Sequence, residues 1–288
     1  MLANIQKHDL SIIVSHPDEP FKRRAVDRGA IAAASALEAA AESDIVVTQV
    51  PSMEALRHVY ESEQGIFAGA RAGTTIVDCS AVAPEFARQL SERARAIGLH
   101  LADAPPSGGL HDARLGTLSF SVGADRKVFD TVLPVLRMMG RFALYCGGPG
   151  SGQAARLCNS VLWAVSEAAT IEAMALGASL GIEPSTLAAF INACNEHSRV
   201  SGDHVSQVSG RKAPGEPREP DISIDIALRD VSLALEAANE SRQSLILTTV
   251  VRQLLRSSAE RGWGGKNCSW LGRLYHGSER PSSTPSSD

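Results

Sequence analysis

The chain has 288 residues, 44% hydrophobic and 21% charged, a composition typical of globular proteins and a length sufficient for two domains. Its formal net charge of −4 excludes the overall basic field with which proteins hold nucleic acid or anionic membranes. We therefore expect a small-molecule partner, with no nucleic acid and no membrane.

The ends and the cysteines of the chain give further exclusions. Residues 1–7 are too short and too polar for a signal peptide, and no unbroken apolar run reaches the roughly 18 residues of a membrane span. These features predict a cytoplasmic protein. The five cysteines are odd in number and form no Cys-x-x-Cys pair, so we expect neither a disulfide framework nor a metal site.

Short β-branched runs alternate with helical stretches in the first half of the chain. The predicted strands are 10–14, 45–50, 74–78, 99–102 and 118–122. Nearly unbroken apolar strands between helices predict an α/β fold with a parallel, Rossmann-like sheet that is covered on both faces. In this sheet we expect strand 45–50 to be central and parallel to both strand 10–14 and strand 74–78.

The second half of the chain is helical in pattern. One apolar stripe recurs at spacings of three and four, which predicts a helix of roughly 28 residues, about 42 Å long; its members are Leu157, Val161, Ala164, Ala168, Ile171 and Ala175. We predict an α/β domain over residues 1–149 and an all-helical domain over 150–277. A proline-rich loop over 209–220 and a disordered tail over 278–288 complete the chain. Apolar faces on this stripe and on 222–238 and 243–260 predict a homodimer through the helical domain.

Two segments carry a family resemblance. They are Asp103-Ala-Pro-Pro-Ser-Gly-Gly to Val122-Gly123, and Gly147-Gly-Pro-Gly-Ser-Gly-Gln-Ala-Ala-Arg-Leu-Cys-Asn159. They resemble the β-hydroxyacid dehydrogenases, the family of 3-hydroxyisobutyrate and 6-phosphogluconate dehydrogenases, and the resemblance extends from Met1 to about Tyr275. It implies an NAD(P)-dependent oxidoreductase that acts on a small hydroxy acid or its oxo partner, with NADP or NAD as cofactor.

The resemblance also implies what precedes the first helix. In the family, a strand and a Gly-x-Gly-x-x-Gly turn stand there, and the turn offers a helix N-terminus to the pyrophosphate. Here Met1 already aligns within that helix. We therefore expect an N-terminally truncated Rossmann-like domain without its first strand and glycine-rich turn, and a sequence shortened by a start-site error is one explanation.

Four residues are candidates for contact with the cofactor. The resemblance implies that Gln49, Val50, Pro51 and Ser80 lie against it. For Ser80 an equally good interpretation is an ordinary helix N-cap, because it is followed by Ala-Val-Ala-Pro-Glu.

A glycine-containing loop is the candidate substrate site. Glycines let a ligand approach the backbone and leave amide donors available, and a neighbouring hydroxyl holds a carboxylate or carbonyl oxygen. The resemblance implies that Ser107, Gly108 and Gly109 bind the substrate, which we expect to be anionic. Where the family pattern has a small aliphatic residue, this chain has Pro106, which stiffens the loop.

The catalytic position departs from the family pattern. In relatives a lysine on the long helix donates the proton, one turn before an asparagine; here Asn159 matches the asparagine, but Arg156 replaces the lysine. With a pKa of at least ~12.5, deprotonating arginine at neutral pH costs upward of ~7 kcal/mol. Arg156 can clamp a carboxylate or stabilise developing charge, so another group must donate the proton. His111 is the nearest candidate in sequence, and surface decoration is its alternative role.

At Arg229, too, an arginine replaces a lysine of the family, and its role is open. Arg229 stands where the family has a lysine; it either contacts cofactor or substrate or forms an ion pair with Asp230 or Asp225. Three functions remain: the hydroxy-acid oxidoreductase, an imine reductase-like enzyme with Arg156 as an electrostatic group, and a non-catalytic relative that serves as a binding or dimerisation module.

Overall fold

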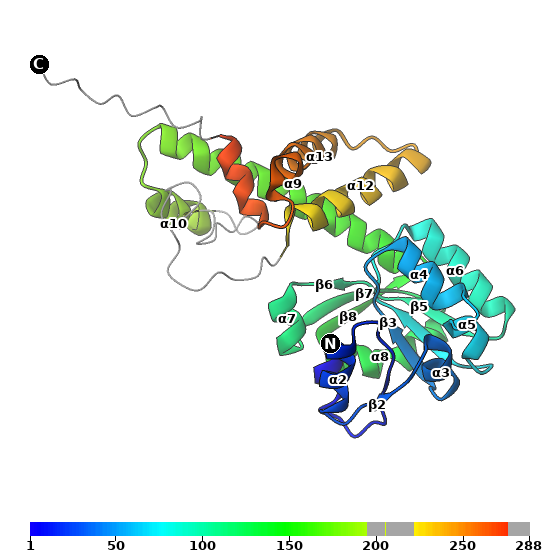
Figure 1. Cartoon of the computed structure of the whole chain (residues 1–288). Helices are drawn as coiled ribbons and strands as arrows, with labels where there is room; N and C mark the ends of the chain where they lie inside the picture. Colours follow the sequence, from blue (N-terminus) through cyan, green and yellow to red (C-terminus); the bar gives the residue numbers. More distant parts are fainter. Residues whose placement is uncertain (195–204, 206–221, 276–288) are drawn as a thin grey trace, which may run out of the picture. The chain divides into compact units, whose positions relative to one another are not determined.

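The computed structural model describes residues 1–194, residue 205 and residues 222–275. Contacts divide the chain into an N-terminal unit, Met1–Cys158, and a C-terminal unit, Asn159–Asp288 (Figure 1). The predicted loop over 209–220 and the predicted tail over 278–288 lie outside the described residues. The boundary predicted between residues 149 and 150 stays a prediction.

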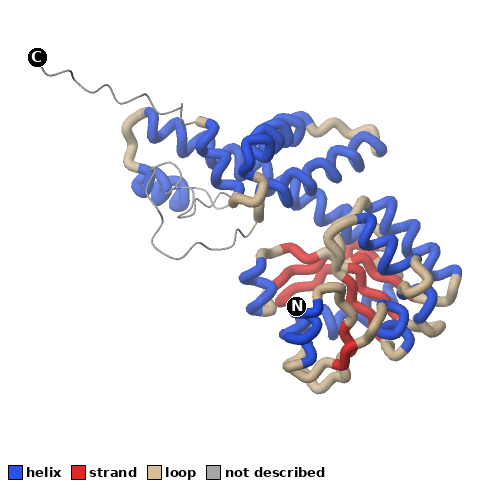
Figure 2. The backbone as a smooth tube through the Cα atoms, in the orientation of Figure 1, coloured by secondary structure: helices blue, strands red, loops and turns tan. Residues whose placement is uncertain are grey.

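The N-terminal unit is an alternation of strands and helices. Its strands are β1 (Ile13–Val14), β2 (Ile31–Ala32), β3 (Ile45–Thr48), β4 (Thr75–Asp78), β5 (His100–Asp103), β6 (Pro106–Ser107), β7 (Leu118–Gly123) and β8 (Gly140–Gly147). Its helices are α1 (Leu2–Ile5), α2 (Glu19–Val26), α3 (Ala36–Ala41), α4 (Met53–Glu61), α5 (Ile66–Gly69), α6 (Pro84–Ala96), α7 (Leu110–Leu115) and α8 (Arg126–Met139). The predicted α/β class is confirmed (Figure 2).

The sheet is mixed, whereas the sequence predicted a parallel one. β3, β4 and β5 are parallel neighbours, but β7 runs antiparallel to β5 and β6, and β8 pairs parallel to β7. The chain returns from β5 through only the short β6 and α7, and β6 and β7 form an antiparallel pair, so the strand direction reverses there. β8 was not predicted.

Two expectations about the first strands were wrong. β3 is an edge strand of the six-stranded sheet, because no strand among the described residues pairs with its outer side. β1 does not pair with β3. It pairs parallel with β2 in a separate two-stranded sheet, where the carbonyls of Ile12 and Val14 accept hydrogen bonds from Ile31 and Ala33.

Apolar cores cover both faces of the larger sheet, which explains the unbroken apolar strands. Because successive side chains on a strand point to opposite faces, Ile76 packs with α4 and α6, while Val77 packs with α8. Met1 and Ile5, at the first helix, pack against the core that contains Val77 and α8. The predicted covering on both faces is thereby confirmed.

The long predicted helix is α9 (Ser151–Ser179), and the contact division at Cys158 falls within it. The C-terminal unit continues with α10 (Pro184–Cys194), α12 (Ile224–Glu240), α13 (Ile246–Ser258), a π-helical turn η1 (Ala259–Trp263) and a 3-10 helix η2 (Cys268–Leu274). Four residues of the predicted stripe are fully buried, namely Leu157, Ala164, Ala168 and Ile171.

By its length and averaged hydropathy, α9 is a helix that could cross a membrane. This finding is contrary to the expectation that no apolar run reaches the length of a membrane span. Core helices of soluble proteins pass the same test, and Ala164, Ala168 and Ile171 of α9 belong to the core with α12 and α13. The hydropathy of α9 is therefore weak support for a membrane span.

Candidate active site

Three polar residues line up where the parallel strands end. Thr48 pairs in register with Asp78, and Asp78 with Asp103, at the carboxyl ends of β3, β4 and β5. All three are buried, the two aspartates with at most 1% of their surface exposed. Ligands of open α/β sheets bind outside the carboxyl ends of the strands, so this edge is the first place to look for a site.

Asp78 is the centre of a buried hydrogen-bond network. One of its oxygens, Oδ1, accepts from the hydroxyls of Thr48 at 2.9 Å and Ser80 at 2.7 Å, and Thr48 is 2.7 Å from the hydroxyl of Tyr60. Burial raises the pKa of Asp78, and the hydrogen bonds from Ser80 and Thr48 partly oppose the rise. The backbone N–H of Val50 donates to the Ser80 hydroxyl at 3.1 Å.

This network decides one of the alternatives for Ser80. α6 begins at Pro84 with Ala83 as its N-cap, so the N-cap interpretation of Ser80 is wrong. The Ser80 hydroxyl instead joins β4 to the turn after β3, where Val50 lies. Contact of Ser80 with a cofactor stays a prediction.

Asp103, at the end of β5, caps the N-terminus of the long helix α9. Its carboxyl oxygens accept from the backbone N–H groups of Gly150 at 2.7 Å and Gln153 at 2.8 Å, at the N-terminus of α9. Negative charge is favoured there by the helix dipole. Complete burial nevertheless disfavours the charged form and raises the pKa of Asp103 to about 7, while the two N–H groups lower it. The group therefore titrates near neutral pH.

Gly152 makes this close approach possible. A Cβ atom at this position would lie 2.6 Å from the backbone carbonyl oxygens of both Asp103 and Ser121, closer than any side chain permits. The glycine spacing of the Gly147–Gly152 segment therefore lets the start of α9 rest against the ends of β5 and β7.

Arg156 lies one turn further along α9 and is 5% exposed. Its Nε donates to Oε1 of Gln153 at 3.5 Å. Gln153 also donates from Nε2 to the carbonyl oxygen of Ser80 at 2.7 Å. Gln153 thus connects Ser80 to Arg156 by hydrogen bonds. Ser80 and Arg156 were singled out from the sequence, whereas Gln153 was not.

The Ser107–Gly109 loop is organised locally. Gly108 has a φ of 126°, in the region that favours glycine, and Ser107 ends β6. Asp112 accepts from the Gly109 N–H at 3.1 Å and from the hydroxyl of Thr117 at 2.9 Å, and these bonds lower its pKa. Asp112 therefore holds the loop's shape.

The remaining predicted residues are on or near the surface. Gln49 and Pro51 are exposed after β3, and His111 is exposed in α7. Asn159 is exposed one turn after Arg156 in α9. Arg229 contacts Asp230 through Nε at 3.2 Å and Nη2 at 3.1 Å, which is the ion pair given above as its alternative role.

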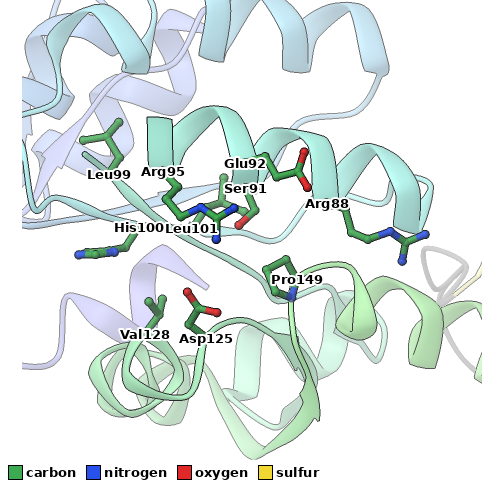
Figure 3. Close-up of a pocket in the computed structure, with 10 residues that line it drawn as sticks. All are labelled: Arg88, Ser91, Glu92, Arg95, Leu99, His100, Leu101, Asp125, Val128 and Pro149. Carbon is green, nitrogen blue, oxygen red and sulfur yellow. The ribbon is translucent and has the colours of Figure 1, made fainter. Parts of the chain in front are cut away.

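A pocket of about 200 Å³ opens between α6 and the N-terminus of α8, and Pro149, just before α9, is part of its lining. Arg95 of α6 and Asp125 point into it (Figure 3), and Glu92 and His100 are part of its lining. Because acidic and basic groups share the lining, it favours neither ligand charge. None of the predicted site residues lines it, and we assign it no catalytic role.

Sequence reasoning missed Asp103 and Gln153. Asp103 carried a visible signal, because it directly follows the predicted strand 99–102, as Asp78 ends the predicted strand 74–78, and parallel strands bring such side chains to one edge. Gln153 carried none, since its partners Ser80 and Val82 are 73 and 71 residues away.

Comparison with known proteins identifies the family of this chain. Residues 1–148 match the family model for the NAD binding domain of 6-phosphogluconate dehydrogenase. Residues 150–275 match the one for NAD-binding of NADP-dependent 3-hydroxyisobutyrate dehydrogenase. The chain belongs to the β-hydroxyacid dehydrogenase family.

Individual relatives cover most of the chain. A 3-hydroxyisobutyrate dehydrogenase of Pseudomonas aeruginosa is 33% identical over 88% of this chain and 87% of its own. An NAD-dependent L-serine dehydrogenase of the same organism is 33% identical over 87% and 85%. Among solved structures, a Mycobacterium tuberculosis 3-hydroxyisobutyrate dehydrogenase with L-serine has a TM-score of 0.83 at 27% identity and covers 95% of this chain and 93% of that one.

These matches confirm the predicted family and an NAD(P)-dependent oxidoreductase similar to 3-hydroxyisobutyrate dehydrogenase, with NAD or NADP as cofactor. An imine reductase of Myxococcus stipitatus, with a TM-score of 0.60 at 17% identity over 94% of each chain, shares the fold alone.

Proposed function

We propose that this β-hydroxyacid dehydrogenase oxidises small 2-substituted 3-hydroxypropanoates, with NAD or NADP as the acceptor. The observation that carries the proposal is the chemistry common to two relatives. 3-Hydroxyisobutyrate and L-serine, named for the relatives at 33% identity, both bear a hydroxymethyl group on the carbon attached to the carboxylate. They differ in the third substituent, a methyl group or an ammonium group.

The substrate's carboxylate is assigned to the Ser107–Gly109 loop and Arg156. The loop offers a hydroxyl and a backbone that is open to close approach at Gly108. Arg156 offers a permanent positive charge with planar, forked geometry, which matches a carboxylate. Its burial strengthens that attraction, because water no longer screens it.

Oxidation of the hydroxymethyl carbon removes a hydride, which the nicotinamide accepts when bound, and a proton, which leaves from the hydroxyl oxygen. Arg156 cannot take that proton at neutral pH. We assign proton transfer to His111, an exposed imidazole in α7, directly after the Ser107–Gly109 loop.

The described residues fit a dinucleotide at the carboxyl ends of β3 and β4. Gln49 and Pro51 are exposed there and available to a ligand, as the rule for open α/β sheets requires. Val50 and Ser80 support these two residues, since the N–H of Val50 donates to the hydroxyl of Ser80. They act by holding the turn at Gln49 in place. Arg229 is a further candidate for the cofactor.

Self-association is the second part of the proposal. The C-terminal unit exposes large apolar side chains, which in a soluble protein favour burial against a second copy. Those more than half exposed are Leu162, Leu176, Leu180, Phe190, Ile246, Leu247 and Val250. A homodimer through these helices would cover them. A cytoplasmic location stays a prediction from the sequence.

Initial rates test the substrate class. With NAD and with NADP, the chain should oxidise 3-hydroxyisobutyrate or L-serine at least tenfold more efficiently than lactate, whose hydroxyl is on the carbon next to the carboxylate. Equal rates on lactate, or reduction of a cyclic imine as the only activity, would refute the proposal and favour the imine-reducing alternative.

A further inference from the structure

The side chain of Gln153 is buried without exposed surface, and both ends of its amide are engaged. Its Oε1 accepts from the N–H of Val82 at 3.3 Å and from Nε of Arg156 at 3.5 Å. Its Nε2 donates to the carbonyl oxygen of Ser80 at 2.7 Å. Its backbone N–H donates to Asp103 at 2.8 Å, so the residue is also fixed to the end of β5.

These partners allow the amide only one orientation. The Ser80 oxygen can only accept and the Val82 N–H can only donate, so a flipped amide would set an NH2 group against a donor and an oxygen against an acceptor. The oxygen is therefore always presented to Arg156. Because the backbone groups of Ser80 and Val82 follow β4, the sheet itself fixes that oxygen in space.

We propose that Gln153 is a positioning residue that sets the place and the plane of the Arg156 guanidinium for the substrate's carboxylate. The inference rests on the proposed function of Arg156. A guanidinium is planar, so an acceptor at Nε, together with the side-chain stem, fixes the direction in which the rest of the group faces. A lysine ammonium has no such plane, and this chain's arginine therefore needs the oriented acceptor more than the family's lysine does.

The contact itself can be measured without activity. In nitrogen-labelled protein, the Nε–H resonance of Arg156 is identified by its absence in Arg156→Lys. We expect Gln153→Met, which keeps the length of the side chain but removes its amide, to shift this resonance and speed its exchange with water at least tenfold. Gln89→Met is the matched control, because Gln89 lies exposed on α6 with only Glu85 as its amide's partner.

The effect on the substrate is measured by a double-mutant cycle in the full chain. Gln153→Met should raise KM for the hydroxy acid roughly tenfold, because a misplaced guanidinium would lose one charged hydrogen bond to the carboxylate. In the Arg156→Ala background the same substitution should change KM by less than about twofold. A purely structural role would give equal changes in both backgrounds.

Each outcome decides a separate point. An unmoved Nε–H resonance in Gln153→Met, or an equal change of KM in both backgrounds, would overturn the positioning role. A moved resonance with unchanged KM in Gln153→Met, where Arg156→Ala does raise KM, would overturn it as well. If Arg156→Ala itself leaves KM unchanged, the proposed function of Arg156 is wrong, and Gln153 orients a group that does not meet substrate.

Discussion

Asp103→Asn is the substitution whose consequence the structure specifies best. Asparagine keeps the shape of the side chain but cannot be charged, and its NH2 group would face one of the two N–H donors that Asp103 accepts, those of Gly150 and Gln153. The variant should therefore be less stable than the wild type. The size of the difference should depend on pH.

The direction of this pH dependence follows from the raised pKa of Asp103. An aspartate with a folded-state pKa of about 7, against an ordinary value of 3.8, binds its proton more tightly in the folded state. The resulting stabilisation is complete below the ordinary pKa and is lost as the pH rises through the folded pKa. Between pH 5 and pH 8 the wild type should lose about 2.5 kcal/mol of unfolding free energy through this group.

Chemical unfolding of both proteins at pH 5 and pH 8 measures this loss. Far-UV circular dichroism is the suitable signal, because all three tryptophans lie in the C-terminal unit and Asp103 in the N-terminal one. The pKa of Asp78 is raised by burial in both proteins, so its own contribution largely cancels in the difference, and only its effect on the pKa of Asp103 is confined to the wild type. The wild type's advantage over the variant should shrink by about 2.5 kcal/mol from pH 5 to pH 8. An advantage that is constant or grows would show that Asp103 stays ionised.

Four further outcomes are expected. Gly152→Ala should lower the unfolding free energy by about 2 kcal/mol or more, because its Cβ overlaps two carbonyl oxygens, whereas Gly148→Ala, with nothing within 4 Å, should be nearly neutral by the same unfolding assay. Tyr60→Phe should cost about 1 kcal/mol, the contribution of its bond to Thr48, and a zero cost would contradict that bond. Arg156→Lys should raise kcat for the hydroxy acid, since lysine can exchange a proton, and also raise KM, since an ammonium lacks the planar fork; a lower kcat would show that lysine exchanges no proton at this position. Light scattering should give about twice the chain's 30.4 kDa, and a monomer at micromolar concentration would refute the dimer.

Local patterns predicted much of the fold. Strands β3, β4, β5 and β7 and helix α9 each lie within a few residues of the predicted segments, because apolar runs and helical periodicity are properties of neighbouring residues. The position of β3 in the sheet was not predicted correctly, since strand order depends on pairing between distant segments. β8 was missed although its side chains alternate, with Phe142 and Leu144 exposed and Ala143 and Tyr145 packed against the core.

Only those candidate site residues were predicted whose side-chain type alone indicates a chemical role. Arg156 stood out because a guanidinium in place of a lysine changes what a proton donor can do. Gln153 and Asp103 matter through bonds to residues 47 or more positions away, which no local pattern encodes. Ser80 was singled out from the sequence as a cofactor contact or a helix N-cap, and its hydrogen bond to Asp78 appeared only in the folded chain.

Reduction of NAD and NADP by the chain, followed by nicotinamide absorbance with 3-hydroxyisobutyrate, L-serine and lactate as substrates, tests the central claim most directly. We expect turnover of at least one 2-substituted 3-hydroxypropanoate, little or none of lactate, and a raised KM in Arg156→Ala. Binding of either cofactor, checked by fluorescence titration with NADH and NADPH, together with no oxidation of any hydroxymethyl acid, would contradict it.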